Sequence, residues 1–99
     1  MPTADVNTIL TLDVSGLNIF DLTGIEDFIA LQDLNVSNNM LTSLVLSTNL
    51  GLQILDCSIN QIIDLDLSQN TVLTSVLCGN NALRTLNIEN GNNAAVTVF

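Results

Sequence analysis

The sequence predicts a solenoid, in which stacked coils of the chain build a parallel β-sheet with little helix. Leu occurs 18 times and Asn 14 times among 99 residues, a bias that is typical of internal repeats rather than of an ordinary globule. Three consecutive segments also place their apolar residues in the same columns when they are offset by 21 residues. Because one such segment cannot bury its apolar face alone, neighbouring segments must stack on one another.

Four repeats account for most of the chain. The second, third and fourth begin at Leu31, Leu52 and Leu73. The first is one residue longer, because Ile9 aligns with Leu31 and the following columns stay in step. We therefore divide the chain into a lead-in over 1–8, repeats over 9–30, 31–51, 52–72 and 73–93, and the start of a truncated further repeat over 94–99.

Each repeat is expected to contribute two short extended segments. In the second repeat, polar residues separate Leu34 from Val36, so these two side chains point inward and their neighbours outward, as in a half-buried strand. We expect such strands to form a parallel sheet on the concave side. A second apolar pair follows half a repeat later and predicts short strands or turns on the convex side: Leu44 and Leu46, Leu65 and Leu67, Leu86 and Ile88.

A helical signal is present in the first repeat, where Ile25, Phe28 and Ile29 have helical spacing. This spacing predicts one short helical turn at that place.

Asparagine recurs at both turns of the repeat. Asn39, Asn60 and Asn81 follow the first strand and predict a ladder, because a buried side-chain amide can satisfy backbone groups that a sharp corner leaves unpaired. In the first repeat Leu17 takes this place with Asn18 beside it, so that corner must be built differently. The second turn carries Asn49, Asn70 and then Gly91, residue types that tolerate the left-handed backbone expected there.

The shared pattern L-x-x-L-x-L-x-x-N-x-L resembles the leucine-rich repeat from about Ile9 to Asn93. The sequence from Leu55 to Asn70 resembles repeats of secreted or surface proteins of the Bacteroidota. The segment Asp21 to Ile25 is similar to internalin-like bacterial repeats. The resemblance implies a binding scaffold in a secreted or cell-surface bacterial protein. The first residues of the chain lack the basic start and apolar run of a secretory signal.

The two cysteines, Cys57 and Cys78, lie 21 residues apart in an inward column shared with Val14 and Val36. Valine and cysteine have similar volumes, so we expect buried structural thiols. A disulfide between adjacent coils is the alternative, because the coil spacing falls within the Cα separation of a bridge. A metal site on two cysteines is less favoured, since the chain has no His or third Cys.

Charge and composition exclude several function classes. Ten acidic residues against Arg84 alone give a net charge of −9, so nucleic acid and anionic lipid surfaces would repel the chain. No apolar stretch is long enough to insert into a membrane. Without His, Lys or Tyr the usual general bases and imidazole ligands are missing, so we expect neither an enzyme nor a bound cofactor.

Function is therefore expected to be recognition by the outward residues of the predicted concave sheet. These residues mix carboxylates and hydroxyls with two apolar side chains where the repeat would tolerate polar ones. We expect a protein or glycan partner, with a cationic surface favoured by the charge. The candidate partner-binding residues are Asp13, Asp33, Asn35, Ile54, Asp56, Ser75 and Leu77.

Other interpretations remain open. The chain can be a structural spacer within a longer repeat stalk, and its Ser and Thr ladders can bind ice or mineral. Asp64 and Asp66 point outward together, but they supply too few oxygens for calcium, and solvated charges are expected there. The last coil, near Val96, Val98 and Phe99, has no polar cap, which predicts end-to-end self-association.

Overall fold

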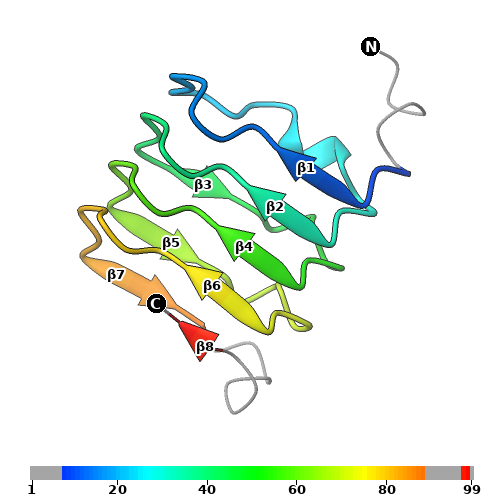
Figure 1. Cartoon of the computed structure of the whole chain (residues 1–99). Helices are drawn as coiled ribbons and strands as arrows, with labels where there is room; N and C mark the ends of the chain where they lie inside the picture. Colours follow the sequence, from blue (N-terminus) through cyan, green and yellow to red (C-terminus); the bar gives the residue numbers. More distant parts are fainter. Residues whose placement is uncertain (1–7, 89–96, 99) are drawn as a thin grey trace.

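The computed structural model describes residues 8–88 and the backbone of 97–98, which form one stack of coils with a parallel sheet on each of two sides (Figure 1). The order of the larger sheet is β1-β2-β4-β6-β8. Its strands are β1 (Thr11–Asp13), β2 (Asp33–Asn35), β4 (Ile54–Asp56), β6 (Ser75–Leu77) and β8 (Thr97–Val98). The smaller sheet consists of β3 (Leu44–Val45), β5 (Asp64–Asp66) and β7 (Thr85–Asn87), in that order.

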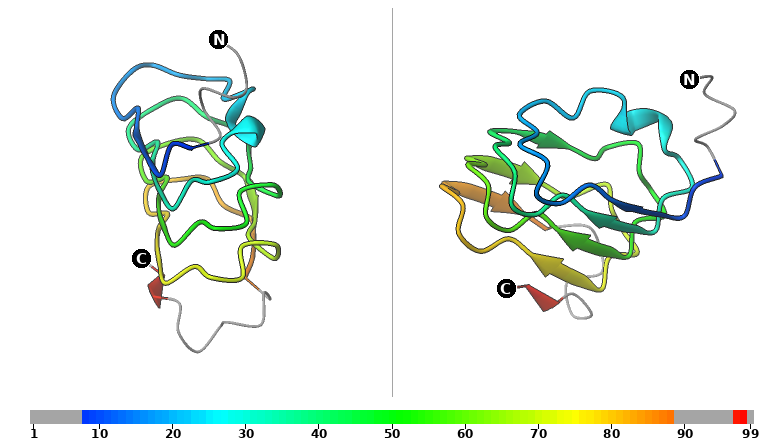
Figure 2. Two further views of the ribbon diagram at one scale, coloured as in Figure 1. Left: turned by 90° about the vertical axis from the view of Figure 1, so that its right-hand side faces the viewer. Right: turned by 45° about the horizontal axis from the view of Figure 1, so that its top comes forward.

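The strands pair in the register that the repeat predicts. In the five-stranded sheet, Leu34 of β2 pairs with Leu12 of β1 on one side and with Leu55 of β4 on the other, and Leu55 pairs with Val76 of β6. In the three-stranded sheet Leu65 of β5 lies between Leu44 and Leu86. The two side views show the coils stacked along one axis (Figure 2). The expected parallel-stranded solenoid is confirmed, including the short strands on its second side.

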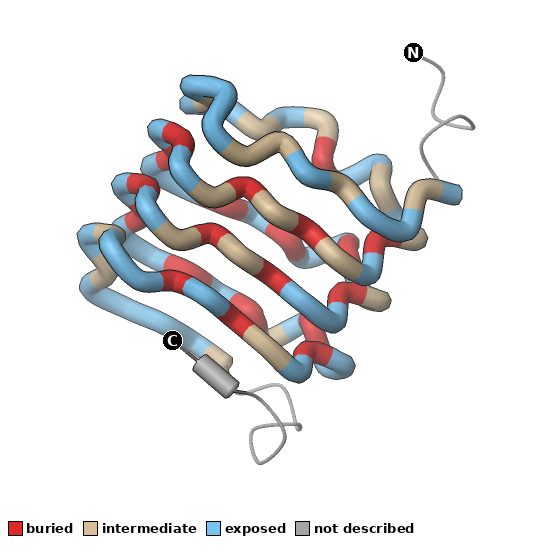
Figure 3. The backbone as a smooth tube through the Cα atoms, in the orientation of Figure 1, coloured by how far each residue is buried: buried red, intermediate tan, exposed pale blue. Residues whose placement is uncertain are grey.

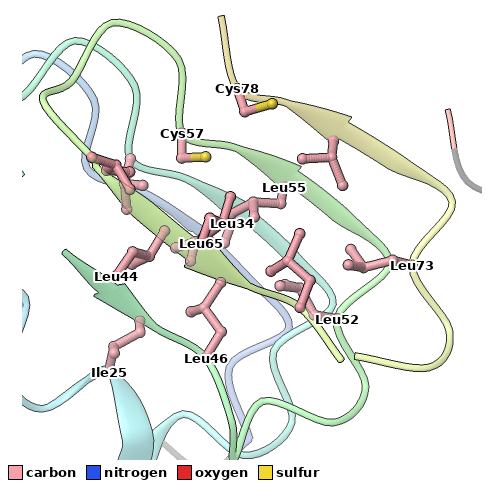
Figure 4. Close-up of a cluster of buried hydrophobic side chains, with 14 of the residues drawn as sticks. Ile25, Leu34, Leu44, Leu46, Leu52, Leu55, Cys57, Leu65, Leu73 and Cys78 are labelled. Carbon is pink, nitrogen blue, oxygen red and sulfur yellow. The ribbon is translucent and has the colours of Figure 1, made fainter. Parts of the chain in front are cut away.

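The hydrophobic core lies between the two sheets and runs the length of the stack (Figure 3). Leu34 and Leu55 point into it from the five-stranded sheet, and Leu44 and Leu65 point into it from the other (Figure 4). Val76 of β6 is also fully buried in this core. Burial alternates along the strands, as in the exposed–buried–exposed pattern of β5, because successive side chains of a strand point to opposite faces. The inward residues therefore hold the coils together, and the outward residues are left to solvent.

The expected helical turn is present but short. It is the 3₁₀ turn η1 (Ile25–Asp27), in which Ile25 is buried. Phe28 is half-buried, whereas Ile29 is 57% exposed and lies outside the core. The chain leaves helical geometry at Phe28, with φ −85° and ψ 63°, so the spacing that relates Ile29 to Ile25 no longer places it on the inner side.

The predicted asparagine ladder is confirmed after the main strands. The Nδ2 of Asn60 donates to the carbonyl oxygens of Val36 at 3.0 Å and Cys57 at 3.1 Å, while its Oδ1 accepts the backbone N–H of Leu41 at 3.0 Å. Asn39 and Asn81 repeat this arrangement one coil away on either side. Each amide thus joins its own corner to the preceding coil.

The corner of the first repeat is built differently, as expected. Leu17 stands where the ladder would continue, and its backbone N–H and that of Ile19 both donate to Oδ1 of Asn39 at 3.0 Å. Gly16 and Asn18 adopt positive φ values of 67° and 57°. One asparagine of the second repeat therefore closes two corners.

The expectation for the second turn was wrong. Within residues 8–88, positive φ values occur at Gly16, Gly24, Asn18, Asn38, Ile59 and Asn80, and neither Asn49 nor Asn70 is among them. Both are fully buried instead, and they form a second ladder. Nδ2 of Asn49 donates to the carbonyls of Ile25 and Phe28, and Nδ2 of Asn70 donates to those of Leu46 and Asn49, all at 3.0 Å. Asparagine is needed here for its amide rather than for its backbone freedom. Gly91 lies outside the described residues.

The cysteines are buried free thiols on neighbouring coils, as predicted (Figure 4). Burial raises the pKa of Cys57 to about 12, with smaller contributions from Cys78 in its thiolate form and from the carboxylate of Asp56. Burial raises the pKa of Cys78 as well. Both thiols therefore remain protonated at neutral pH and serve as small apolar core groups.

Candidate functional site

The seven predicted partner-binding residues all lie on the outer surface of the five-stranded sheet. We call this surface the main face and define it by Thr11, Asp13, Asp33, Asn35, Ile54, Asp56, Ser75 and Leu77. The strand registers place these residues in two rows, one running through Thr11, Asp33, Ile54 and Ser75 and the other through Asp13, Asn35, Asp56 and Leu77. Alternation along each strand brings them together, as the sequence predicted.

The main face is acidic at one end and apolar at the other. Asp13 and Asp33 lie on β1 and β2 and line, together with Asn35, a shallow hollow of about 230 Å³. Ile54 and Leu77 lie on β4 and β6 and are 43% and 36% exposed. Asp56 lies between the two parts, paired with Asn35 on one side and Leu77 on the other.

Most acidic groups at the strand ends also stabilise the turn that follows. Oδ1 of Asp13 accepts the backbone N–H of Ser15 at 3.0 Å and its hydroxyl at 2.7 Å. Asp56 makes the same pair of contacts with Ser58, at 3.1 and 2.6 Å. The bonds from the Ser15 hydroxyl and then from its backbone N–H lower the pKa of Asp13, so this carboxylate is ionised and a weak base.

A second, larger surface lies on the outer side of the three-stranded sheet. We call it the rear face and define it by Ser43, Val45, Ser47, Asp64, Asp66, Ser68, Thr85 and Asn87, all of which line an open groove of about 930 Å³. A smaller hollow of about 390 Å³ adjoins it next to η1 and shares Val45 with it. The sequence placed Asp64 and Asp66 outward but gave no reason to expect a groove there.

The carboxylates of the rear face are hydrogen-bonded on one oxygen each. Oδ1 of Asp64 accepts the hydroxyl of Thr85 on the next coil at 2.6 Å. Oδ1 of Asp66 accepts the backbone N–H of Ser68 at 2.9 Å. The Ser68 side-chain bond, followed by its backbone bond, lowers the pKa of Asp66, which is therefore ionised at neutral pH.

The described residues offer little for metal or membrane chemistry. No group of three or more His, Cys, Asp or Glu side chains gathers among residues 8–88 in a way that could hold a metal ion. Within the same part of the chain, no helix has the length and apolar character needed to cross a membrane. What the surfaces present is therefore charge, hydroxyls and a few exposed apolar side chains.

Comparison with known proteins identifies the fold. The sequence matches no protein-family model and no curated protein. Among solved structures, the chain is similar to the functional domain of InlJ from Listeria monocytogenes, which includes a cysteine ladder, with a TM-score of 0.72 and 24% sequence identity. The match covers 88% of this chain and 22% of that chain, so the chain spans about a fifth of its length. The fold is thus a solenoid of the leucine-rich-repeat type, like that of this internalin-like protein.

Proposed function

We propose that this chain is a non-catalytic binding scaffold whose main face recognises a protein or glycan with a cationic surface. The observation that carries the proposal is the exposure of Ile54 and Leu77 beside Asp56 on an otherwise polar sheet surface. The fold does not need apolar side chains at these outward positions, since Thr11 and Asp33 occupy the same row as Ile54. Exposed apolar residues ringed by polar ones are typical of contact surfaces.

Charge supports the choice of partner. The net charge of −9 accelerates encounter with basic surfaces and disfavours acidic ones. On the main face Asp13, Asp33 and Asp56 would pair with the partner's cations, while Ile54 and Leu77 would be covered by apolar groups. Binding would then combine a small dry contact with a charged rim.

A bacterial surface setting is part of this proposal. The structural likeness to InlJ agrees with the resemblance of the repeats to internalin-like sequences. The cysteine ladder of the InlJ domain also has a two-coil counterpart in Cys57 and Cys78. We therefore place the scaffold in a secreted or cell-surface protein.

The test uses arrays of purified glycans and of folded basic proteins, followed by biolayer interferometry on each hit. The variants Asp33→Ala/Asp56→Ala and Ile54→Ser/Leu77→Ser should each weaken binding by about tenfold or more, as expected when contacts at the centre of an interface are lost. The control Asp21→Asn/Asp27→Asn removes the same charge from the segment around η1, outside both faces, and should leave affinity within about twofold. Equal losses in both aspartate variants, or no hit on either array, would contradict the proposal and favour the structural spacer.

A further inference from the structure

The rear face has a charge arrangement that the main face lacks. Among the strands in the described part of the chain, β5 alone presents two outward carboxylates, Asp64 and Asp66, whereas β1, β2 and β4 present one each. Residues two apart on a strand are separated by about 6.6 Å along it. The two negative charges of β5 therefore lie on the same side of the strand, separated by the distance between residues i and i+2.

These carboxylates lie in a groove that has an apolar side chain within reach. Val45 pairs in register with Asp66, so the two side chains lie on neighbouring strands about 4.8 Å apart. Val45 is 68% exposed, an unusual degree for an apolar residue inside a groove. No lysine or arginine lines the groove, so no cation of the lining neutralises Asp64 or Asp66.

Both carboxylates can accept further hydrogen bonds. Thr85 and Ser68 occupy one oxygen of Asp64 and of Asp66, respectively, which fixes the two side chains in position. An ionised carboxylate offers about four acceptor sites, so each of these exposed side chains has capacity for an incoming donor. Held anions with free acceptor oxygens need little reorganisation when they bind a cation.

We propose that the rear face binds an extended peptide segment of a partner protein that carries basic residues at alternate positions. Alternate side chains of an extended peptide have the same spacing of about 6.6 Å as Asp64 and Asp66, so a peptide lying along β5 places one cation over each carboxylate. The methylene stem of the lysine or arginine over Asp66 then packs on Val45. This surface lies on the opposite sheet from the main face, so the proposal is independent of the function proposed above.

The probe is the capped peptide Gly-Lys-Ser-Lys-Gly, titrated into the ¹⁵N-labelled chain and followed by NMR chemical shifts. Its matched control, Gly-Lys-Lys-Ser-Gly, has the same composition and charge but directs its two lysines to opposite sides of an extended backbone. We expect the strongest shifts at residues 43–47, 64–68 and 85–87, with the control binding several-fold more weakly. No shift at these residues, or equal affinity of the two peptides, would overturn the proposal.

Variants separate a built groove from general attraction to an acidic protein. Asp64→Asn/Asp66→Asn keeps acceptors for Thr85 and Ser68 and should weaken the probe by about tenfold, as expected for the loss of two ion pairs. Asp21→Asn/Asp27→Asn removes the same charge from the segment around η1, outside both faces, and should change the affinity by less than about twofold. Equal effects of the two double variants on the affinity would overturn the proposal. It would also be overturned if a neutral oligosaccharide changed the chemical shifts of the same residues and the peptide did not.

Discussion

Raising the pH above about 9 should destabilise the chain through one buried thiol. Cys57 is 0% exposed, and burial raises its pKa from the ordinary 9.0 to about 12. The unfolded chain releases this proton near pH 9.0, whereas the folded chain holds it until about pH 12. The stabilising contribution is therefore complete below pH 9 and is lost as the pH rises through this window.

The size of the effect follows from the two pKa values. With 9.0 unfolded and about 12 folded, the free energy of unfolding falls by about 1.4 kcal/mol at pH 10 and about 2.7 kcal/mol at pH 11, relative to pH 8. A domain of this size has a total stability of roughly 5–15 kcal/mol, so the loss is measurable. Few other groups interfere, because the chain has no Tyr or His and Arg84 is its only Lys or Arg.

The assay is urea unfolding followed by far-UV circular dichroism at pH 8, 10 and 11, with Cys57→Val as the matched control. Valine fits this position, since Val36 is buried in the same column one coil away. The variant should lose much less stability than the natural chain between pH 8 and 11, and any loss that remains reports on Cys78, whose pKa burial also raises. An equal decline in both proteins, or no decline in the natural chain, would show that the Cys57 thiol does not resist ionisation in the fold.

Three further substitutions test the corners and the core by urea unfolding at neutral pH. Asn60→Ala should cost about 2 kcal/mol, because it leaves the buried Leu41 N–H without its acceptor and removes one of the two amide donors to the Val36 and Cys57 carbonyls, and a loss below about 0.5 kcal/mol would contradict the ladder. Ile59→Gly should stabilise the chain by about 1 kcal/mol, because a β-branched residue is strained at a φ of 55°; a destabilised variant would refute this reasoning. Leu55→Ala should cost about 2–5 kcal/mol, since it opens a cavity in a fully buried site, and a smaller cost would mean that the coils collapse around it.

Much of the fold could be predicted because each structural position occurs once in every repeat, so the sequence shows its preferred residue type several times. Leu34, Leu55 and Val76 share a column in the sequence, and the pleat turns a shared column into a shared side of the sheet. The function of Asn49 could not be inferred in the same way. Asparagine suits turns both by adopting left-handed backbone and by bonding to carbonyls, and the sequence does not distinguish these uses. Only the position of the Ile25 and Phe28 carbonyls shows which one applies.

The candidate surfaces were predictable to different degrees for a related reason. The position of every main-face residue follows from the alternation of side chains along a strand and from the register between strands. Both can be predicted from the repeat pattern of the sequence. The rear groove depends on how β3, β5 and β7 lie side by side and on the small side chains around Val45, which leave space that larger ones would fill. A groove of this kind arises from the packing of side chains on neighbouring strands, which the sequence does not show. The sequence around Asp64 and Asp66 therefore predicted only solvated charges.

The acidic residues of the two faces do not have equal meaning for function. Asp13, Asp56 and Asp66 accept the N–H of the residue two positions on, so the turn itself gives a reason for an oxygen acceptor there. Asp64 bonds to the next coil rather than to its own turn, and an asparagine could do the same. On β2 it is Asn35 that stabilises the turn, through the Ser37 N–H, and Asp33 makes no such contact. Among the acidic residues of the two faces, Asp33 is therefore the one whose negative charge has the weakest structural reason. A substitution at Asp33 is the most informative test, because it should change binding with little change in stability.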